Sequence, residues 1–365
     1  MSRPRALVEA ELLAWMREEP WRDDDTRFAR LALELFALQF ERCAPYQAYC
    51  RRRGATPDRV SDWRAIPTVP TSAFKEVALR CFPADRTLRT FRTSGTTTGA
   101  RGELHLDRLD LYEASLLPTF RRHLLPDLAE GRRATILALA PPPEEAPDSS
   151  LGHMLATAIA ALGAPGSGFF VARGVLREHA LAAAIGAAGA GPLLLAGTAF
   201  AFVHWLDALE RRGERLALRP AARLMETGGT KGRARELAPG ELHAALASRL
   251  GLSPARIVNQ YGMTELGSQF YDSSLAQPGA PRHKLGPPWA RVRLLDPETG
   301  ADAAPGEVGA IAVLDLANTG SVAAIRTADL GRRIGDGFEV LGREPGAEAR
   351  GCSIAADELL AGVRA

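Results

Sequence analysis

The feature that most constrains the fold is a regular alternation of short apolar runs and longer helical segments between Ala134 and Gly262. Runs such as ATILALA (134–140) have the length of buried strands, and segments such as LGHMLATAIAALG (151–163) have the length of helices. This alternation predicts right-handed βαβ units and a parallel sheet covered by helices on both faces. The other predicted elements are strands at 168–172, 192–197, 221–229 and 256–262 and helices at 176–189, 199–213 and 239–251.

The two flanks of this region have different patterns. Residues 1–65 carry apolar side chains at helical spacing, which predicts a helical N-terminal segment. From about Leu285, short β-forming runs alternate with turns such as PETG, which predicts a small antiparallel or barrel-like subdomain. We therefore expect a helical segment at 1–65, an α/β core at 66–284 and a β-rich subdomain at 285–365.

Charge and cysteine content exclude several classes of protein. The 45 basic and 43 acidic residues are spread along the chain, so the basic patch of a nucleic-acid binder is missing. The four cysteines have neither metal-site spacing nor a disulfide framework, and we expect Cys43 and Cys50 to be core thiols. The uncharged stretch 180–206 is broken by glycine and proline, which favours buried elements over a membrane span. The N-terminus lacks the pattern of a signal peptide, so we expect a soluble cytoplasmic protein.

Four motifs could carry chemistry. The first, RTSGTTTGARG (92–102), places hydroxyls and glycines where backbone N–H and side-chain O–H groups can form a nest for phosphates, although it lacks the lysine of a Walker A loop. The second, NQYGMTE (259–265), could stack an adenine on Tyr261 and hold Mg²⁺ with Glu265. A plain turn for the first motif and a strand end with a capping Thr264 for the second remain the alternatives.

The third motif, IRTADLG (325–331), offers Asp329 as an acceptor for a ribose diol, and the fourth is GREPGAEARGCS (342–353). Taken together and in this order, the four resemble the core motifs of the adenylate-forming superfamily of acyl-CoA synthetases and firefly luciferase-type enzymes. The resemblance covers roughly residues 65–353. It departs from the family pattern at Thr98, Ala100 and Arg101, which replace a glycine, a proline and a lysine of the phosphate loop.

The resemblance implies a fold and a set of binding residues. The fold is the large N-terminal-type domain of these enzymes, with parallel βαβ sheets covered by helices and a β-rich subdomain. The cofactors implied are ATP and Mg²⁺, with Glu265 at the metal. The nucleotide-binding residues implied are Thr93, Ser94, Gly95, Thr96, Thr97, Gly228, Gly229, Tyr261, Gly262, Thr264, Asp329 and Arg343.

The end of the chain resembles one branch of the superfamily, the acyl-protein synthetases of bacterial luminescence. A typical superfamily member continues into a C-terminal domain that carries a lysine for adenylation, whereas here the last residue, Ala365, follows soon after Cys352. We therefore expect the usual C-terminal domain to be missing. In this branch a cysteine near the C-terminus accepts the acyl group, and Cys352 matches it by position. A thiolate is a good nucleophile, and Arg350 would favour the thiolate; the alternative is a buried, unreactive thiol.

The adenylation step needs a cation at the developing charge. The chain has only three lysines, Lys75, Lys231 and Lys284. Lys231 follows the glycine turn at a predicted strand end, so we favour it over Arg101, and the alternative is a solvated loop residue. The acyl pocket is expected along GTAFAFVHWLDAL (197–209), although most of its apolar side chains are more typical of a core than of ligand contacts.

The sequence thus predicts ATP-dependent activation of a carboxylic acid, a fatty acid being favoured, followed by acyl transfer to Cys352 and on to a partner such as a reductase or carrier. One alternative is an acyl- or aryl-CoA ligase of the phenylacetate type, in which CoA is the acceptor. The other is a non-catalytic nucleotide-binding remnant, suggested by Arg101 in place of the loop lysine. The sequence does not fix the acyl chain, the final acceptor or the oligomeric state.

Overall fold

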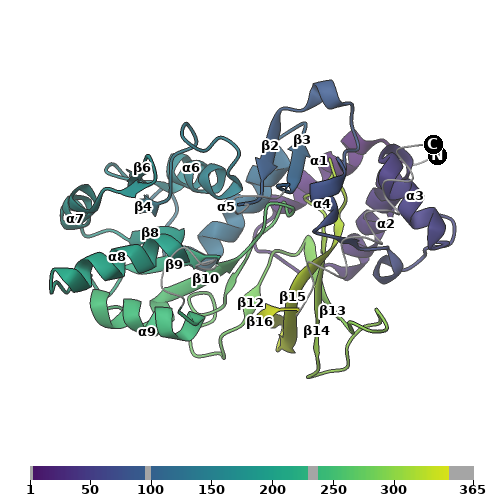
Figure 1. Cartoon of the computed structure of the whole chain (residues 1–365). Coiled ribbons are helices and arrows are strands. Elements are labelled where there is room, and N and C mark those ends of the chain that lie inside the picture. Colours follow the sequence, from purple (N-terminus) through teal and green to yellow (C-terminus); the bar gives the residue numbers. More distant parts are fainter. Residues whose placement is uncertain (1–2, 95–99, 229–236, 345–365) are drawn as a thin grey trace. The chain divides into compact units, whose positions relative to one another are not determined.

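The computed structural model describes residues 3–94, 100–228 and 237–344, and the chain divides into two compact units (Figure 1). The first unit takes the chain up to Pro118, the segment Met263–Gln269 and the residues from Leu285 onward. The second unit takes Thr119–Gly262 and Phe270–Lys284. The helix α5 (Asp110–Leu124) runs from the first unit into the second.

The second unit contains the predicted parallel sheet. Its strand order is β5 (Gly168–Phe169), β4 (Thr135–Leu139), β8 (Leu193–Thr198), β9 (Arg223–Thr227) and β10 (Ile257–Tyr261), all parallel, with β11 (Phe270–Asp272) antiparallel to β10. The helices between the strands are α6 (Ser150–Leu162), α7 (Glu178–Ala187), α8 (Ala199–Arg211) and α9 (Pro239–Leu250). The prediction of βαβ units is confirmed, and the carboxyl ends of the parallel strands share one edge of the sheet.

The helices of the second unit lie on both faces of its sheet. Figure 1 shows α8 and α9 on one side of the strands and α6 on the other. Phe202 and Trp205 of α8 and Leu246 of α9 are buried in one cluster with side chains of β8 and β9. Gly197 permits close packing within the sheet, because a Cβ there would stand 2.6 Å from the carbonyl oxygen of Leu139 on β4. Burial of this apolar layer stabilises the unit by about 25 cal/mol per Å² of buried surface.

Side-chain caps fix where the helices begin. The hydroxyl of Thr198 accepts a hydrogen bond from the backbone N–H of Ala201 at 3.1 Å, and that of Ser149 accepts one from Gly152 at 3.0 Å. Each cap satisfies one backbone donor of the first helical turn. Because Thr198 both ends β8 and caps α8, the chain passes from strand to helix without an intervening loop.

One predicted strand differs from the observed structure. The run 168–172 forms two short strands, β5 and β6 (Val171–Ala172), and β6 turns back into β7 (Val175–Leu176). The two turn residues Arg173 and Gly174 both have positive φ, which is the geometry of a tight hairpin turn. As a result α7 begins at Glu178 rather than at residue 176.

The first unit combines helices with an antiparallel sheet. The strands β13 (Ala290–Leu295), β14 (Val308–Asp315), β15 (Ala324–Ile334) and β16 (Gly337–Arg343) pair in this order, and β1 (Val69–Pro70) runs parallel to β15. The antiparallel pairing confirms the predicted β-rich subdomain.

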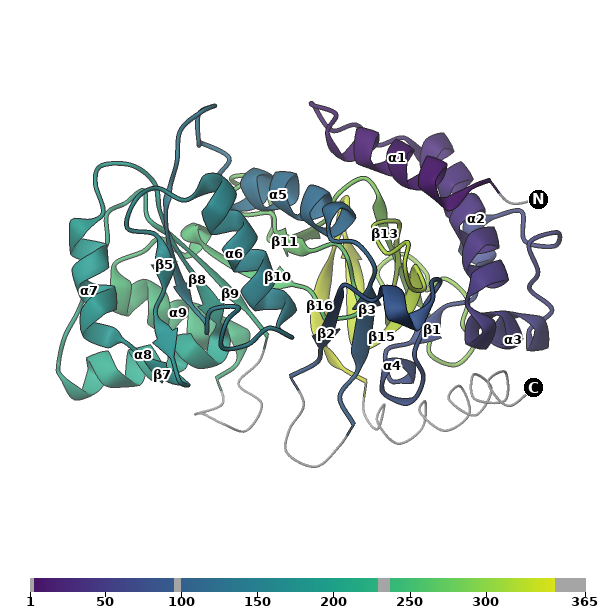
Figure 2. The ribbon, with the colours of Figure 1, turned by 90° about the horizontal axis from the view of Figure 1, so that it is seen from above.

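The helices of the first unit are α1 (Arg5–Met16), α2 (Asp25–Arg42), α3 (Ala44–Arg52) and the short α4 (Ala73–Glu76). A separate hairpin pairs β2 (Arg89–Arg92) with β3 (Glu103–Leu106) (Figure 2).

No helix in the described part of the chain is both long enough and apolar enough to cross a membrane. The uncharged stretch 180–206 instead contributes to α7, β8 and α8.

Candidate active site

The hydroxyl-rich loop is anchored at its base, between β2 and β3. The backbone N–H of Thr93 donates to the carbonyl oxygen of Gly102 at 2.9 Å, and the N–H of Gly102 donates to the Thr93 hydroxyl at 2.9 Å. Arg101 Nε donates to the Thr93 carbonyl oxygen at 2.6 Å. Ser94 is exposed beside this base. The predicted phosphate ligands Gly95, Thr96 and Thr97 lie outside the described residues.

The side chain of Glu265 lies against the same loop base. A Cβ atom on Gly102 would stand 3.2 Å from Glu265 Oε1 and 3.1 Å from Thr93 Cγ2, so only glycine leaves both side chains undisturbed. Thr264 and Glu265 are both buried, although they belong to a polar motif. The first unit thus brings together two motifs that are far apart in the sequence.

This arrangement fits Mg²⁺ held in part by a nucleotide. No group of three or more His, Cys, Asp or Glu side chains in the described residues is placed to form a complete metal cage. A single carboxylate beside a loop rich in phosphate-binding donors is instead the donor set that Mg²⁺ uses when substrate phosphates and water complete its coordination. Glu265 is the side chain that would hold the ion.

Asp329 lies on β15, and its backbone is fixed by a neighbouring hydroxyl. The N–H of Asp329 donates to the Thr327 hydroxyl at 3.1 Å, and that hydroxyl donates to the carbonyl oxygen of Ile311 on β14 at 2.9 Å. The Asp329 carboxylate is 18% exposed and pairs with Arg343 Nε at 3.7 Å. These two predicted nucleotide-binding residues, on β15 and β16, therefore lie together.

The predicted nucleotide-binding residues Gly228, Tyr261 and Gly262 lie at the strand ends of the second unit. Gly228 follows β9 with φ of +76°, a conformation that favours glycine. Tyr261 ends β10, and its ring lies 6.3 Å from that of Phe270. Gly262 packs against the side-chain amide of Gln260, which leaves no space for a Cβ. Gly229 lies outside the described residues.

Beneath these strand ends lies a buried polar network that the sequence patterns did not reveal. Glu226 of β9, only 2% exposed, accepts hydrogen bonds from Asn259 Nδ2 at 2.7 Å and His243 Nε2 at 2.9 Å. The network therefore ties β9 to β10 and to α9. The available sequence signal was a charged residue, Glu226, within a strand, RLMET (223–227), that the alternating pattern predicts to be buried.

Lys284 belongs to the same network. Its Nζ donates to Asp272 Oδ1 at 2.8 Å and to the carbonyl oxygen of Asn259 at 2.8 Å. Burial lowers the pKa of Lys284, and Asp272 offsets only part of that effect. For Asp272, burial acts to raise the pKa, but the Lys284 ammonium outweighs it, so the pKa lies below its usual value. The Lys284 ammonium is thus held by hydrogen bonds inside the second unit.

Each remaining lysine or cysteine named from the sequence lies outside the described residues, is exposed, or is buried in the core. Lys231 and Cys352 lie outside the described residues. Lys75 is exposed on α4. Cys43 and Cys50 are buried, which confirms them as core thiols, and Cys81 is buried as well.

The proposed acyl segment after β8 lies mostly in the core. Phe202, Val203 and Trp205 are buried in the main cluster of the second unit. His204 is exposed, and its ring makes an edge contact with Phe200 at 4.5 Å. Phe200 is half-buried, as are Thr198, Ala201 and Asp207, so the described part of this segment exposes few apolar side chains.

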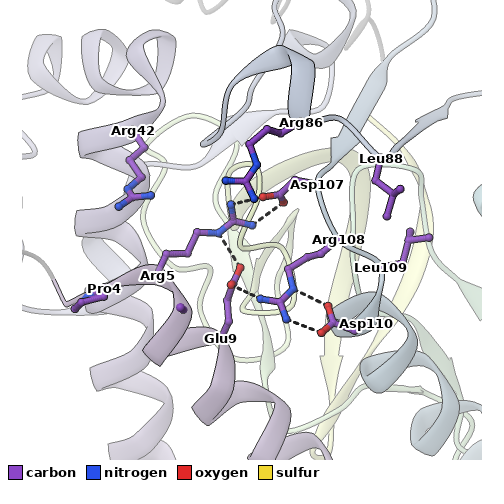
Figure 3. A pocket seen from close by; sticks show the side chains of 11 residues that line it. Pro4, Arg5, Glu9, Arg42, Arg86, Leu88, Asp107, Arg108, Leu109 and Asp110 are labelled. Atoms are coloured by element: carbon purple, nitrogen blue, oxygen red, sulfur yellow. Dashed lines mark hydrogen bonds and ion pairs between the residues drawn. The ribbon is translucent and has the colours of Figure 1, made fainter.

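A cavity of about 690 Å³ in the first unit contains none of the predicted site residues (Figure 3). It lies at the end of the β2–β3 hairpin opposite the hydroxyl-rich loop, since Leu88 and Asp107 line it. Arg5 forms paired hydrogen bonds with Asp107 at 2.7 and 2.8 Å, and Arg108 pairs with Asp110. Because charges of both signs are paired within it, the cavity does not indicate a particular ligand.

Comparison with solved structures identifies the type of fold. An open conformation of 2-hydroxyisobutyryl-CoA ligase in complex with 2-HIB-AMP and CoA superposes with a TM-score of 0.61 at 13% identity, over 90% of this chain and 75% of that one. The same ligase in the thioesterification state gives 0.60 at 14% identity, over 94% and 69%. An acyl-CoA synthetase from Brucella canis gives 0.51 at 20% identity, over 71% of this chain and 45% of that chain. The fold is therefore that of adenylate-forming ligases.

Comparison with curated protein sequences finds no match. The sequence profile of the family described as "Acyl-protein synthetase, LuxE" matches residues 6–361, which is nearly the whole chain. This match agrees with the resemblance found in the four motifs. The chain belongs to the LuxE acyl-protein synthetase family.

Proposed function

We propose that this chain is an ATP-dependent cytoplasmic ligase that activates a carboxylic acid, with a fatty acid favoured, and transfers the acyl group to a thiol. The observation that most supports this is the position of Glu265, whose buried carboxylate lies against the loop base at Thr93 and Gly102. Mg²⁺ bound there would neutralise phosphate charge during the reaction.

The reaction has two steps. In the first, a carboxylate oxygen of the acid attacks the α-phosphorus of ATP, and the bond from that phosphorus to pyrophosphate breaks. In the second, a thiolate attacks the acyl carbon, the bond from that carbon to AMP breaks, and a thioester remains. We assign the thiolate to Cys352, which would pass the acyl group to a partner protein or a small thiol.

The binding roles follow from the motifs and their positions. Asp329 would accept hydrogen bonds from the ribose, with Arg343 beside it, and Tyr261 would contact the adenine. The loop from Thr93 would bind the β- and γ-phosphates through N–H and O–H groups. The remaining proposed nucleotide-binding residues come from three segments. They are Ser94, Gly95, Thr96 and Thr97 in the loop, Gly228 and Gly229 at the adenine, and Gly262 and Thr264 in the strand-end motif.

Lys231 is the cation that we assign to the α-phosphate. Lys284 is held by Asp272 in the interior of the second unit, and Arg101 donates to the backbone of its own loop. We therefore expect Lys231→Met to lower the rate of adenylation about 100-fold or more, because the developing charge would lose its partner. Arg101→Met should act mainly on the KM for ATP by loosening the loop base.

Two measurements test the proposal. Carboxylate-dependent exchange of labelled pyrophosphate into ATP reports adenylation, and it should be strongly reduced, but still measurable, in Glu265→Gln. Incubation with ATP, Mg²⁺ and radiolabelled myristate should leave hydroxylamine-sensitive label on the protein. Cys352→Ser should abolish that label without abolishing exchange, whereas the neighbouring change Ser353→Ala should preserve both.

The other outcomes select between the alternatives. CoA-dependent release of AMP that is unchanged in Cys352→Ser would indicate an acyl- or aryl-CoA ligase. Tight ATP binding without exchange, for every acid in a panel of short, long and aromatic carboxylates, would indicate a nucleotide-binding protein without ligase activity.

A further inference from the structure

The turn that follows Glu265 is held by a buried carboxylate on another strand. Asp315, the last residue of β14, is fully buried. Its Oδ2 accepts hydrogen bonds from the backbone N–H of Gly267 at 2.8 Å and of Ser268 at 2.7 Å. Its Oδ1 accepts from the Ser268 hydroxyl at 2.7 Å and from the N–H of Ala317 at 3.1 Å. Four donors on one carboxylate fix both the turn and the end of β14.

A second side chain from the same end of β14 holds Glu265 itself. Asn318 Nδ2 donates to the backbone carbonyl oxygen of Glu265 at 3.0 Å and to that of Val322 at 3.0 Å. Because the amide group donates to two carbonyl oxygens, its orientation is determined. The backbone of Glu265 is thus held by Asn318 on one side, while Asp315 holds the turn two and three residues further on.

The residues that bond to Asp315 and Asn318 are themselves held by further hydrogen bonds. Gln39 of α2 donates to the Asn318 carbonyl oxygen at 2.9 Å and accepts from the Ala323 N–H at 3.0 Å, which holds the loop after β14. On the other side, the Ser268 hydroxyl lies 2.9 Å from that of Ser115, which accepts from Trp289 Nε1 at 2.8 Å. The buried surroundings leave the turn few alternative positions.

We infer that Asp315 and Asn318 are positioning residues for the Glu265 carboxylate. They set the backbone from which the Glu265 side chain reaches the loop base at Gly102. The inference rests on the proposed function of Glu265 and assigns a role to two side chains outside the four motifs. Side chains that orient a metal-binding carboxylate typically change metal affinity or activity by about 10- to 100-fold when they are replaced.

The central experiment is a double-mutant cycle with Asp315→Asn and Glu265→Gln. Asn at 315 keeps the shape but turns an NH₂ group toward N–H donors, so the turn should shift. We expect Asp315→Asn to raise the Mg²⁺ concentration for half-maximal pyrophosphate exchange by about tenfold or more. In the Glu265→Gln background the same change should cause little further loss. Equal fold losses in both backgrounds would overturn the inference.

A readout independent of activity is the amide hydrogen exchange of Gly267 and Ser268. Both amides should exchange faster in Asp315→Asn, while the matched control Asp302→Asn, at an exposed ion pair with Arg293, should leave them unchanged. Should Asp315→Asn not fold, Asn318→Ala removes the donor to Glu265 with less disturbance and should show the same shift in Mg²⁺ dependence. Unchanged Mg²⁺ dependence in Asn318→Ala would then overturn the inference.

The two proposals can fail separately. Full exchange activity in Glu265→Gln would contradict the role of Glu265, and with it the positioning role. A large loss in Glu265→Gln, with lowered thermal stability but unchanged Mg²⁺ dependence in both Asp315→Asn and Asn318→Ala, would contradict only the positioning role.

Discussion

Glu265 and Gly102 are so close that the carboxylate oxygen Oε1 lies 3.2 Å from the place where a Cβ on residue 102 would stand. This is tighter than an ordinary van der Waals contact, so Gly102→Ala must displace the end of the Glu265 side chain. Because the displaced group is a side-chain terminus, the fold should tolerate the change. We expect pyrophosphate exchange to fall about tenfold or more while the free energy of unfolding changes by less than about 1 kcal/mol.

A glycine without close neighbours provides the control for this prediction. Gly186 lies within α7, and a Cβ there would meet no atom within 4 Å. Gly186→Ala should leave exchange unchanged and stabilise the protein by about 0.5–1 kcal/mol, because alanine favours the helix. Equal activity in Gly102→Ala and Gly186→Ala would show that the contact with Glu265 has no catalytic consequence.

Asp329 and Arg343 form an ion pair whose two members should differ in importance. The Asp329 side chain is 18% exposed, whereas that of Arg343 is 65% exposed. An exposed pair at 3.7 Å contributes little by itself, about 0–1 kcal/mol. If Asp329 binds the ribose, Asp329→Asn should raise the KM for ATP about tenfold or more, since hydrogen bonds to a charged group are worth about 1.5–3 kcal/mol. Arg343→Ala should raise that KM less than about fivefold.

Steady-state kinetics at varied ATP and saturating acid measure both effects. A larger rise in KM for Arg343→Ala than for Asp329→Asn would contradict the assignment of the ribose contact to Asp329.

The elements of the second unit could be predicted from sequence because their signals are local. A strand over 134–140 and a helix over 151–163 differ from β4 and α6 by a residue or two at the ends, since strand length, apolar periodicity and caps such as Ser149 set the bounds. The hairpin at Arg173 and Gly174 was missed because its turn uses a positive φ at an arginine, which no sequence rule favours.

The candidate site was predictable only in part. Motif order singled out Glu265 and Thr93, but it could not indicate that both side chains lie against Gly102. Asp315 was missed because its partners on the turn lie 47 and 48 residues away, and only the folded chain brings them within hydrogen-bond distance. Lys284 had the signal of a rare lysine, yet its burial depends on the pairing of β10 with β11.

Lys284 should be a stabilising residue of the second unit rather than a catalytic one. The residue is 5% exposed and its ammonium donates to Asp272, so Lys284→Met would leave that carboxylate buried with Arg282 and the N–H of Asn259 as its remaining partners. Removing one member of a buried ion pair is expected to destabilise the protein by about 3 kcal/mol. Urea unfolding of Lys284→Met against the exposed control Lys75→Met measures the difference. A change below about 0.5 kcal/mol in both variants would contradict this role.

The same ion pair should contribute to the acid sensitivity of the protein. The pKa of Asp272 lies below its usual value, because Lys284 and the N–H of Asn259 outweigh the effect of burial. A carboxyl group with a lowered pKa in the folded state stabilises the protein above its unfolded pKa, about 3.9, and loses that contribution as the pH falls through the folded pKa. The stability difference between wild type and Asp272→Asn should therefore be largest near neutral pH and shrink below about pH 4.

Unfolding in urea at several pH values between 7 and 3 gives this difference directly. A difference that grows as the pH falls would mean that the carboxyl group is protonated, not charged, in the folded protein at neutral pH.

Of the four cysteines, Cys352 should be the one that reacts in the folded protein. Cys43, Cys50 and Cys81 are all buried. Burial raises the pKa of the Cys50 thiol to about 12, and the hydrogen bond with Cys43 together with burial raises that of Cys81. Cys43 has a lowered pKa through the same contact with Cys81, but its side chain has no exposed surface, which excludes an alkylating reagent. A thiol must be both ionised and accessible to attack an acyl adenylate or iodoacetamide.

Brief alkylation of the native protein at pH 8, followed by peptide mass spectrometry, should therefore label Cys352, while alkylation in denaturant should label all four. Prior incubation with ATP, Mg²⁺ and the acid substrate should protect Cys352, because the thioester occupies its sulfur, and hydroxylamine should restore the labelling. Native labelling at Cys43 or Cys50 ahead of Cys352 would mean that burial does not control thiol reactivity in this chain. A further outcome is that the substrates fail to protect Cys352 in a protein that still catalyses pyrophosphate exchange. That result would show that Cys352 does not carry the acyl group and would leave an external thiol as the acceptor.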